Sequence, residues 1–125
     1  MQRQTQQREA IRRAIEEADR PLSPQEILSS ARRLSPRLGM ATVYRNLGRL
    51  LDEGALRKVD LPGSPNRYER ADKGHHHHFH CERCDRVFEV DDCPGGLGEL
   101  VPAGFRPQDH LIIIYGLCSS CAEKK

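Results

Sequence analysis

Hydrophobic residues in the first half of the chain recur at helical spacing. Between Thr5 and Ala18 the apolar positions repeat at i, i+3, i+4 and i+7, which predicts a helix with one apolar face. Ser23, Pro24 and Glu26 then form the pattern of an N-cap, a first-turn proline and a capping box. A second helix is therefore expected to begin at this point.

The second predicted helix is followed by a third helix and a hairpin. The apolar face of the second helix comprises Ile27, Leu28, Ala31 and Leu34. The third helix runs from Met40 to about Asp52, with Gly54 as its C-terminal cap. Two short β-prone runs, 55–61 and 66–71, flank a turn rich in proline and glycine. Three helices and a hairpin in this order predict a winged helix-turn-helix.

The pattern changes to strands in the second half. Arg86 to Val90 alternates as a strand does, and Leu111 to Tyr115 is apolar and β-branched. Between them, 92–101 contains one proline and three glycines, so any helix there is short. The whole chain is therefore predicted to be α+β, with a small mixed α/β domain after the winged helix.

Charge is distributed unevenly between the two halves. Residues 1–74 carry 15 Lys and Arg against 10 Asp and Glu, whereas residues 75–125 carry 5 against 8. A basic half beside an acidic half is typical of a protein in which one part meets nucleic acid, although an ordinary solvated surface can show the same imbalance.

The sequence has no apolar run long enough to span a membrane, and its first residues lack the apolar stretch of a secretory signal. We therefore expect a cytoplasmic protein without a membrane partner. In that compartment, paired cysteines indicate metal binding or redox chemistry more often than structural disulfides.

Polar positions on the third predicted helix suit the major groove of DNA. An arginine can pair with guanine and an asparagine with adenine, while threonine and tyrosine can contact a thymine methyl group or a phosphate. The alternative is a polar helix face that is only solvated. The candidate DNA-binding residues are Thr42, Tyr44, Arg45, Asn46 and Arg49 on the helix, with Arg57 and Lys58 on the hairpin.

Four cysteines form two Cys-x-x-Cys pairs, Cys81 with Cys84 and Cys118 with Cys121. Four thiolates in two close pairs suit tetrahedral zinc with no open position. Such a zinc would hold together a β domain too small to bury a good core. Two disulfides or a dithiol redox pair are the alternatives.

The segment His75–Cys84 holds five of the six histidines. Affinity tags stand at termini, whereas this run lies inside the chain and continues into the first cysteine pair. Alternate residues of an extended segment share a face, so the run offers two pairs to two different sites. One pair is His76 and His78, and the other is His75 and His77.

Glu69 can approach the first histidine pair, and His110 can approach the second. A site of imidazole and carboxylate should release its metal more easily than four thiolates do, as a metal sensor requires. The plain alternative is a surface histidine cluster with adventitious affinity.

Together these motifs resemble the ferric uptake regulator family of bacterial metal-responsive repressors, and within it the zinc uptake regulator branch. The resemblance covers nearly the whole chain. It rests on Gly39–Leu47, Arg67–Glu69, His75–Cys84, Val87–Pro94 and His110–Cys121.

The resemblance implies a homodimer that binds a palindromic double-stranded DNA operator when loaded with metal. It implies a winged-helix DNA-binding domain over residues 1–72 and a metal-binding dimerisation domain over residues 73–125. Tyr44 and Arg45 match DNA-contacting positions.

The resemblance also implies three sets of metal ligands. The structural zinc site comprises Cys81, Cys84, Cys118 and Cys121, and the regulatory site includes Glu69, His76 and His78. An additional site includes His75, His77 and His110, to which Glu89 and Cys93 are added as candidates.

The sequence departs from the family at two ligands. Several iron-type members have a histidine just before the second helix, where Pro21 stands here, and residues 1–74 contain no histidine. Asp60 is our candidate for the missing regulatory ligand. Gly96 stands about where an acidic ligand of the family falls, with Cys93 close by. Cys93 stays open between a soft ligand, a redox-sensitive thiol and a small buried residue.

Thiolate and imidazole favour zinc over iron or manganese. We therefore expect Zn²⁺ in both the structural and the regulatory site, with Fe²⁺ or Mn²⁺ as alternative regulatory ions, and with peroxide sensing or nickel as further alternatives.

A zinc hydrolase or thiol oxidoreductase is disfavoured, because a catalytic zinc keeps a position for water that four cysteines do not leave. No small-molecule substrate is expected. The sequence predicts a zinc-sensing transcriptional repressor of metal uptake genes, with a metal-buffering protein as a competing class.

Overall fold

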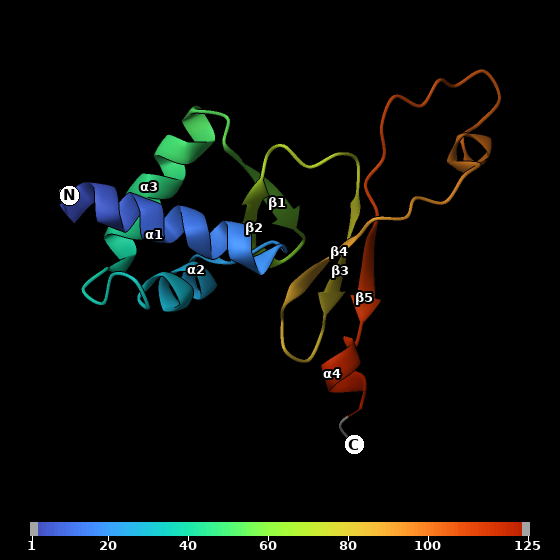
Figure 1. The fold of residues 1–125 in the computed structure, drawn as a ribbon. Coiled ribbons are helices and arrows are strands. Elements are labelled where there is room, and N and C mark those ends of the chain that lie inside the picture. The colour runs from blue at the N-terminus through green and yellow to red at the C-terminus, as the bar shows by residue number, and fades with distance from the viewer. Residues whose placement is uncertain (1–2, 124–125) are drawn as a thin grey trace. The chain divides into compact units, whose positions relative to one another are not determined.

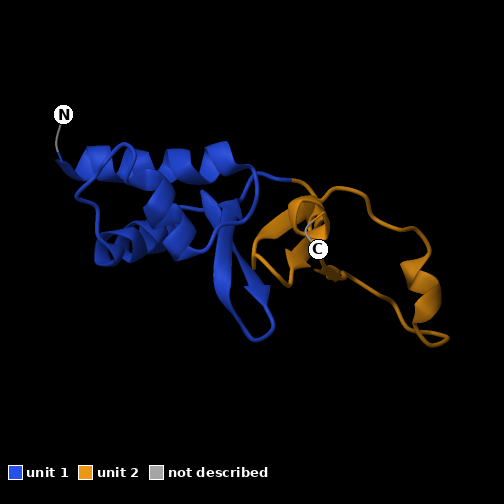
Figure 2. Ribbon diagram, turned by 90° about the horizontal axis from the view of Figure 1, so that it is seen from below, with its two compact units in different colours: residues 1–73 blue, residues 74–125 orange. Residues whose placement is uncertain are grey.

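The computed structural model describes residues 3–123 as a mixed α+β chain, which confirms the predicted fold class (Figure 1). The contacts within the chain divide it into two units, residues 1–73 and residues 74–125, shown in blue and orange in Figure 2. The described part of the first unit consists of helices and a hairpin, and that of the second is built on a three-stranded sheet.

The first unit has a hydrophobic core formed by its three helices. Its elements are α1 (Arg3–Ala18), α2 (Pro24–Ala31), α3 (Met40–Asp52), β1 (Leu56–Leu61) and β2 (Ser64–Arg70). The core includes Ile11, Ile15, Ile27, Leu38, Leu47 and Leu50, each at most 2% exposed. Burying one side chain of this size contributes about 1.5–3 kcal/mol. This core therefore gives the first unit a source of stability that needs no metal.

The predicted capping box begins α2. The Ser23 hydroxyl accepts a hydrogen bond from the Glu26 N–H at 3.2 Å, and the Glu26 carboxylate accepts one from the Ser23 N–H at 3.0 Å. Arg20 donates to the other carboxylate oxygen at 2.7 Å. These bonds satisfy backbone donors that the first turn of a helix leaves without a partner.

Gly54 ends α3 as predicted, with a positive φ of 76° that favours glycine. The N–H of Ala55 donates to the Leu50 carbonyl at 2.9 Å, and the N–H of Gly54 donates to the Leu51 carbonyl at 3.0 Å. This pair of bonds is the Schellman motif, which turns the chain from α3 into the hairpin.

The prediction for Leu34 was wrong. Helix α2 ends at Ala31, whose carbonyl accepts from the N–H groups of both Leu34 and Ser35 as the chain turns. Leu34 lies in that turn and is 54% exposed. Helical spacing cannot place a residue on the buried face once the helix has ended.

Strands β1 and β2 form an antiparallel hairpin that a third segment extends. Leu22 and Tyr68 exchange two backbone hydrogen bonds, at 3.0 and 2.8 Å, so the link between α1 and α2 lies alongside β2. Arg57 lies opposite Glu69, and an irregularity in the register leaves Asp60 out of the pairing. The three helices and this hairpin follow one another in the order predicted for a winged helix.

The second unit is built around the histidine-rich strand. Its strands are β3 (His77–Cys81), β4 (Val87–Val90) and β5 (Ile113–Gly116), in the order β4-β3-β5. Strand β4 pairs antiparallel with β3, and β5 pairs parallel with it. Two short helices, η1 (Leu97–Leu100) and α4 (Ser119–Ala122), complete the described part. The glycine-rich segment thus forms only a short helix, as predicted.

This second unit has almost no hydrophobic core. Among its described residues only His77, Cys81, Val87 and Cys121 are buried. Domains with so little buried apolar surface usually need a disulfide, a metal or a partner subunit for stability. Two of the four buried residues are cysteines, which suggests that a metal takes the place of the core.

Within the described residues, no helix has the length and apolar character needed to cross a membrane.

We expect Glu26→Gln to destabilise the first unit in a pH-dependent way. Burial raises the pKa of Glu26, but the hydrogen bond from the Ser23 backbone and the guanidinium of Arg20 outweigh it, so this pKa lies below its usual 4.5. A carboxyl with a lowered folded pKa stabilises the protein above its unfolded pKa and loses that effect as the pH falls through the folded value.

Urea unfolding followed by helical circular dichroism should therefore give a free energy about 1 kcal/mol lower for the variant at pH 7. The difference should disappear as the pH falls below 4.5. Glu17→Gln is the matched control, because Glu17 is an exposed partner of Arg13 on α1. A difference that stays constant with pH would contradict this account of the capping box.

Candidate metal centres and the DNA-facing helix

The four paired cysteines converge on one point in the second unit. The sulfurs of Cys81, Cys84, Cys118 and Cys121 lie within 4.8 Å of one another, and those of Cys84 and Cys118 are 3.8 Å apart. A zinc ion bound at about 2.3 Å to four sulfurs would separate them by about 3.8 Å. The four thiols are free rather than joined as disulfides. Their arrangement fits a tetrahedral ion with no position left for water.

The surroundings of these thiols shift their pKa values in different directions. The backbone N–H groups of Cys118 and Cys84 donate to the Cys81 sulfur, at 3.4 and 3.5 Å, and lower the pKa of Cys81 to about 6. Burial raises the pKa of Cys121 to about 12 and also raises that of Cys84. A metal that binds here must therefore displace protons, and its affinity falls as the pH falls.

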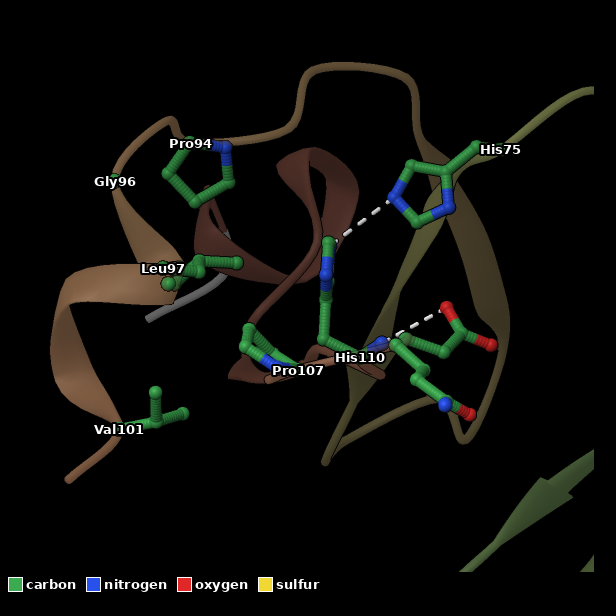
Figure 3. A pocket seen from close by; sticks show the side chains of 10 residues that line it. His75, Pro94, Gly96, Leu97, Val101, Pro107 and His110 are labelled. Atoms are coloured by element: carbon green, nitrogen blue, oxygen red, sulfur yellow. Dashed lines mark hydrogen bonds between the residues drawn. The ribbon is translucent and has the colours of Figure 1, made fainter. Parts of the chain in front are cut away.

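A second cluster combines three histidines and the fifth cysteine, Cys93. It comprises His75, His77, Cys93 and His110. The Nε2 atoms of the three histidines are 3.1–3.2 Å apart, and the Cys93 sulfur is 3.2 Å from Nε2 of His77 and of His110. Figure 3 shows the rings of His75 and His110 directed toward each other.

These distances match the edges of a small coordination tetrahedron. Zinc–nitrogen bonds of about 2.0–2.1 Å imply nitrogen–nitrogen edges of about 3.3 Å. Burial, and then the neighbouring imidazoles, lower the pKa of His77, so its ring is neutral at pH 7 and can give a lone pair to a metal. Cys93 is the fourth potential donor of this cluster, and the donor set fits Zn²⁺.

The other histidine pair lies on the opposite face of β3. The rings of His76 and His78 are 4.8 Å apart. Nδ1 of His76 donates to the Gly74 carbonyl at 2.7 Å, which leaves Nε2 as the metal-binding atom. Its Nε2 lies 3.8 Å from a carboxylate oxygen of Glu89. The alternation predicted for the histidine run is therefore present.

Glu89 does not join the cluster of His75, His77 and His110 for which it was predicted as a ligand. Strand pairing sets Glu89 opposite His78 and Val90 opposite His77. Directly opposed residues share a face of the sheet, so Glu89 belongs with His76 and His78. Sequence spacing could not show this, because the register between β3 and β4 depends on the turn that joins them.

In the first unit, Glu69 is a buried carboxylate. It is 1% exposed and accepts hydrogen bonds from the Arg57 guanidinium at 3.2 and 3.4 Å. Asp60 is exposed and stands three residues farther along β1 than Arg57. At about 3.3 Å per residue this separation is about 10 Å. The hairpin therefore does not bring Asp60 to Glu69 as a second ligand.

Helix α3 presents most of the predicted DNA-binding residues. Tyr44, Arg45 and Arg49 are exposed, and Thr42 is half-buried. Arg45 donates to the Thr42 hydroxyl at 3.0 Å, a weak exposed contact that DNA could replace. These side chains leave one face of α3 polar and accessible, while Val43, Leu47 and Leu50 form the buried face.

Two of the predicted DNA-binding residues make contacts within the protein. Asn46 is 7% exposed, and its side chain donates to the Thr42 carbonyl at 2.9 Å. Arg57 on the hairpin pairs with the buried Glu69. Lys58 beside it is exposed. The prediction of Asn46 as an outward residue was wrong because it stands four residues before Leu50, on the helix face that packs inward.

Comparison with known proteins agrees with this geometry. A family model described as the ferric uptake regulator family matches residues 2–115. The chain belongs to the ferric uptake regulator family. It is 29% identical over 126 residues to the ferric uptake regulation protein of Campylobacter jejuni, covering 97% of this chain and 80% of that protein.

Relatives named for different metals match this member of the family. It is 34% identical over 122 residues to the zinc uptake regulation protein of Mycobacterium tuberculosis, covering 95% of this chain and 94% of that protein. Among solved structures it resembles the Helicobacter pylori ferric uptake regulator, with a TM-score of 0.74 and 29% identity over 95% of this chain and 81% of that one. That structure reveals three functional metal binding sites.

Membership of the ferric uptake regulator family makes the chain a metal-responsive, DNA-binding transcription regulator and not an enzyme. Both iron and zinc appear in the names of its relatives, so the family alone does not assign the metal. The assignment must come from the donor atoms of this chain.

We expect Cys121→Ser to unfold residues 74–125 while α1–α3 stay folded. Cys121 is buried and supplies one of the four converging sulfurs, and the second unit has few other buried residues. Circular dichroism should keep most of the helical signal, and hydrogen exchange should lose protection in β3, β4 and β5. Cys93→Ser is the matched control and should keep that protection. Full protection of the sheet in metal-free Cys121→Ser would show that the four sulfurs do not stabilise this unit.

Proposed function

We propose that this chain is a zinc-responsive transcriptional repressor that controls metal uptake genes. It acts as a homodimer on a palindromic operator. The observation that carries the choice of metal is the cluster of three imidazoles and the Cys93 thiol, in which five of the six distances between donor atoms are 3.1–3.2 Å. A thiolate among imidazoles in a tetrahedron favours zinc over iron and manganese, which prefer more oxygen donors.

The four-cysteine site is proposed to hold a structural zinc. Its support is the convergence of four sulfurs in a unit that otherwise lacks a core. Structural zinc sites of this type supply folding free energy directly. This ion would therefore stay bound while the regulatory ions exchange.

A regulatory site is proposed between the two units, with Glu69 from the first and His76 and His78 from the second. The proposal rests on the resemblance of these residues to the regulatory ligands of the family. Glu89 replaces Asp60 as the candidate for a further ligand, because it lies 3.8 Å from His76. A metal held by ligands from both units would favour one arrangement of the dimer, and so couple metal binding to DNA binding.

DNA recognition is proposed to use the exposed face of α3, with Tyr44, Arg45 and Arg49 as its main residues. Its support is that these side chains are accessible on a helix whose other face is buried. Lys58 on the hairpin is free to meet the phosphate backbone. Asn46 and Arg57 are left out of this proposal because of the contacts they make within the protein.

An iron- or manganese-responsive regulator is the second candidate. The observation that favours it is the set of two imidazoles and a carboxylate at His76, His78 and Glu89, to which Glu69 would add a second carboxylate. More oxygen donors shift a site toward iron and manganese. The two candidates differ in which metal controls DNA binding at its physiological concentration.

Arg45→Ala should weaken operator binding and relax its specificity. A bidentate contact between arginine and guanine is worth about 1–3 kcal/mol, so the dissociation constant should rise about 5- to 150-fold. Fluorescence anisotropy with operator and scrambled fragments at fixed salt measures both effects. Arg13→Ala, which removes an exposed arginine on α1, should change little. If Arg45→Ala bound both fragments as the unaltered protein does, α3 would not be the recognition helix.

Zinc should restore operator binding to protein that keeps only its structural zinc. The free zinc concentration required should be lower than the free concentration of iron or manganese with the same effect. His76→Ala should remove this response and keep one zinc per chain, because His76 is not part of the four-cysteine site. Metal content by mass spectrometry and titrations in metal buffers measure the two outcomes. A response to iron or manganese but not to zinc would show that zinc is not the regulatory metal. A full response in His76→Ala would contradict the assignment of the regulatory site.

A further inference from the structure

Cys93 differs from the other four cysteines in its surroundings. It is exposed, and it is the single sulfur in a cluster whose other donors are imidazole nitrogens. The four-cysteine cluster has two buried members, Cys81 and Cys121. A metal bound by three imidazoles and Cys93 would depend on this one thiolate for a quarter of its coordination.

Hydrogen bonding also separates the two kinds of sulfur. The Cys81 sulfur accepts from two backbone N–H groups, at 3.4 and 3.5 Å. Within residues 3–123 the Cys93 sulfur accepts from none, since its recorded partners are the rings of His77 and His110 and the Pro94 carbonyl. Donated hydrogen bonds withdraw charge from a thiolate and make it less reactive. Cys93 lacks that protection.

Small molecules can approach this cluster from one side. A pocket of about 550 Å³ opens beside it and is lined by His75 and His110 from the cluster itself, with Leu97 of η1 and with Val101 and Pro107 from the segment after it (Figure 3). Pro94, the neighbour of Cys93, also lines it. The loop around the pocket is mostly exposed chain and packs on no core. The site is therefore open to a reagent as small as a peroxide.

We propose that Cys93 is a peroxide-reactive thiolate whose oxidation releases the metal of this cluster, an inference that rests on zinc occupying it as the proposed function states. The thiolate attacks one oxygen of hydrogen peroxide, an S–O bond forms and the O–O bond breaks. The second oxygen leaves as hydroxide and takes a proton to become water. Sulfur loses two electrons and peroxide gains them, so the product is Cys93 sulfenic acid.

The metal leaves because a sulfenic acid is a poor ligand compared with a thiolate. Three imidazoles remain, with one coordination position open to water, and zinc is then held less tightly. The regulator would thereby lose bound zinc under oxidising conditions without losing its structural zinc. Peroxide and zinc shortage would both leave the Cys93 cluster without its zinc.

The test uses the full chain carrying His76→Ala, which removes the proposed regulatory site, with both clusters filled by zinc and hydrogen peroxide as the reagent. A chromogenic chelator follows zinc release, and peptide mapping after dimedone trapping locates the sulfenic acid. With Cys93 intact this protein should release one zinc per chain, with the adduct on Cys93. Cys93→Asp offers zinc a carboxylate, which binds less tightly but cannot form a sulfenic acid. Its release should be at least about 10-fold slower.

The possible failures can be told apart. A chain that holds only one zinc before peroxide is added contradicts the occupied cluster, and the inference fails with it. A chain that holds the second zinc but releases it equally fast in Cys93→Asp contradicts the inference alone. A dimedone adduct on Cys84 instead of Cys93 would also overturn it, and needs no variant.

Discussion

Convergence of four sulfurs on one point is the constraint on which the second unit depends. Its described residues include only four buried side chains, and two of these are Cys81 and Cys121. Burial of so little apolar surface cannot offset the conformational entropy of ordering about fifty residues. A metal bound by two Cys-x-x-Cys pairs would close the segment between them and supply the missing free energy. The histidines on the two faces of β3 can keep their positions only while the sheet stays folded.

Strand β3 distributes the histidine run between two chemically different environments. Alternation sends His75 and His77 toward Cys93 and His110, and sends His76 and His78 toward Glu89. One face is rich in nitrogen with one sulfur, and the other has nitrogen and oxygen donors. Their metal preferences therefore differ, because softer donors favour zinc and harder donors admit iron and manganese. A single strand thus presents two donor sets with different metal preferences.

The first unit has the opposite character, since its stability comes from packing. Its core of isoleucines and leucines orders α1, α2 and α3 without help from a metal, and the capping box and the Schellman motif set where the helices begin and end. This rigidity leaves the exposed face of α3 fixed in shape. On the proposed function, metal binding would change where the two α3 helices of a dimer lie rather than how each one is folded.

The sequence by itself determined the helices, the hairpin, the four-cysteine set and the two histidine faces, because these follow from local periodicity, capping residues and close spacing. Tertiary structure decided the ligands and contacts that come from distant segments. Strand register moved Glu89 to the face of His76, and the loop before β5 brought His110 to Cys93. Packing of α3 buried Asn46, and Glu69 engaged Arg57. Each depends on how separate elements meet, which no local pattern records.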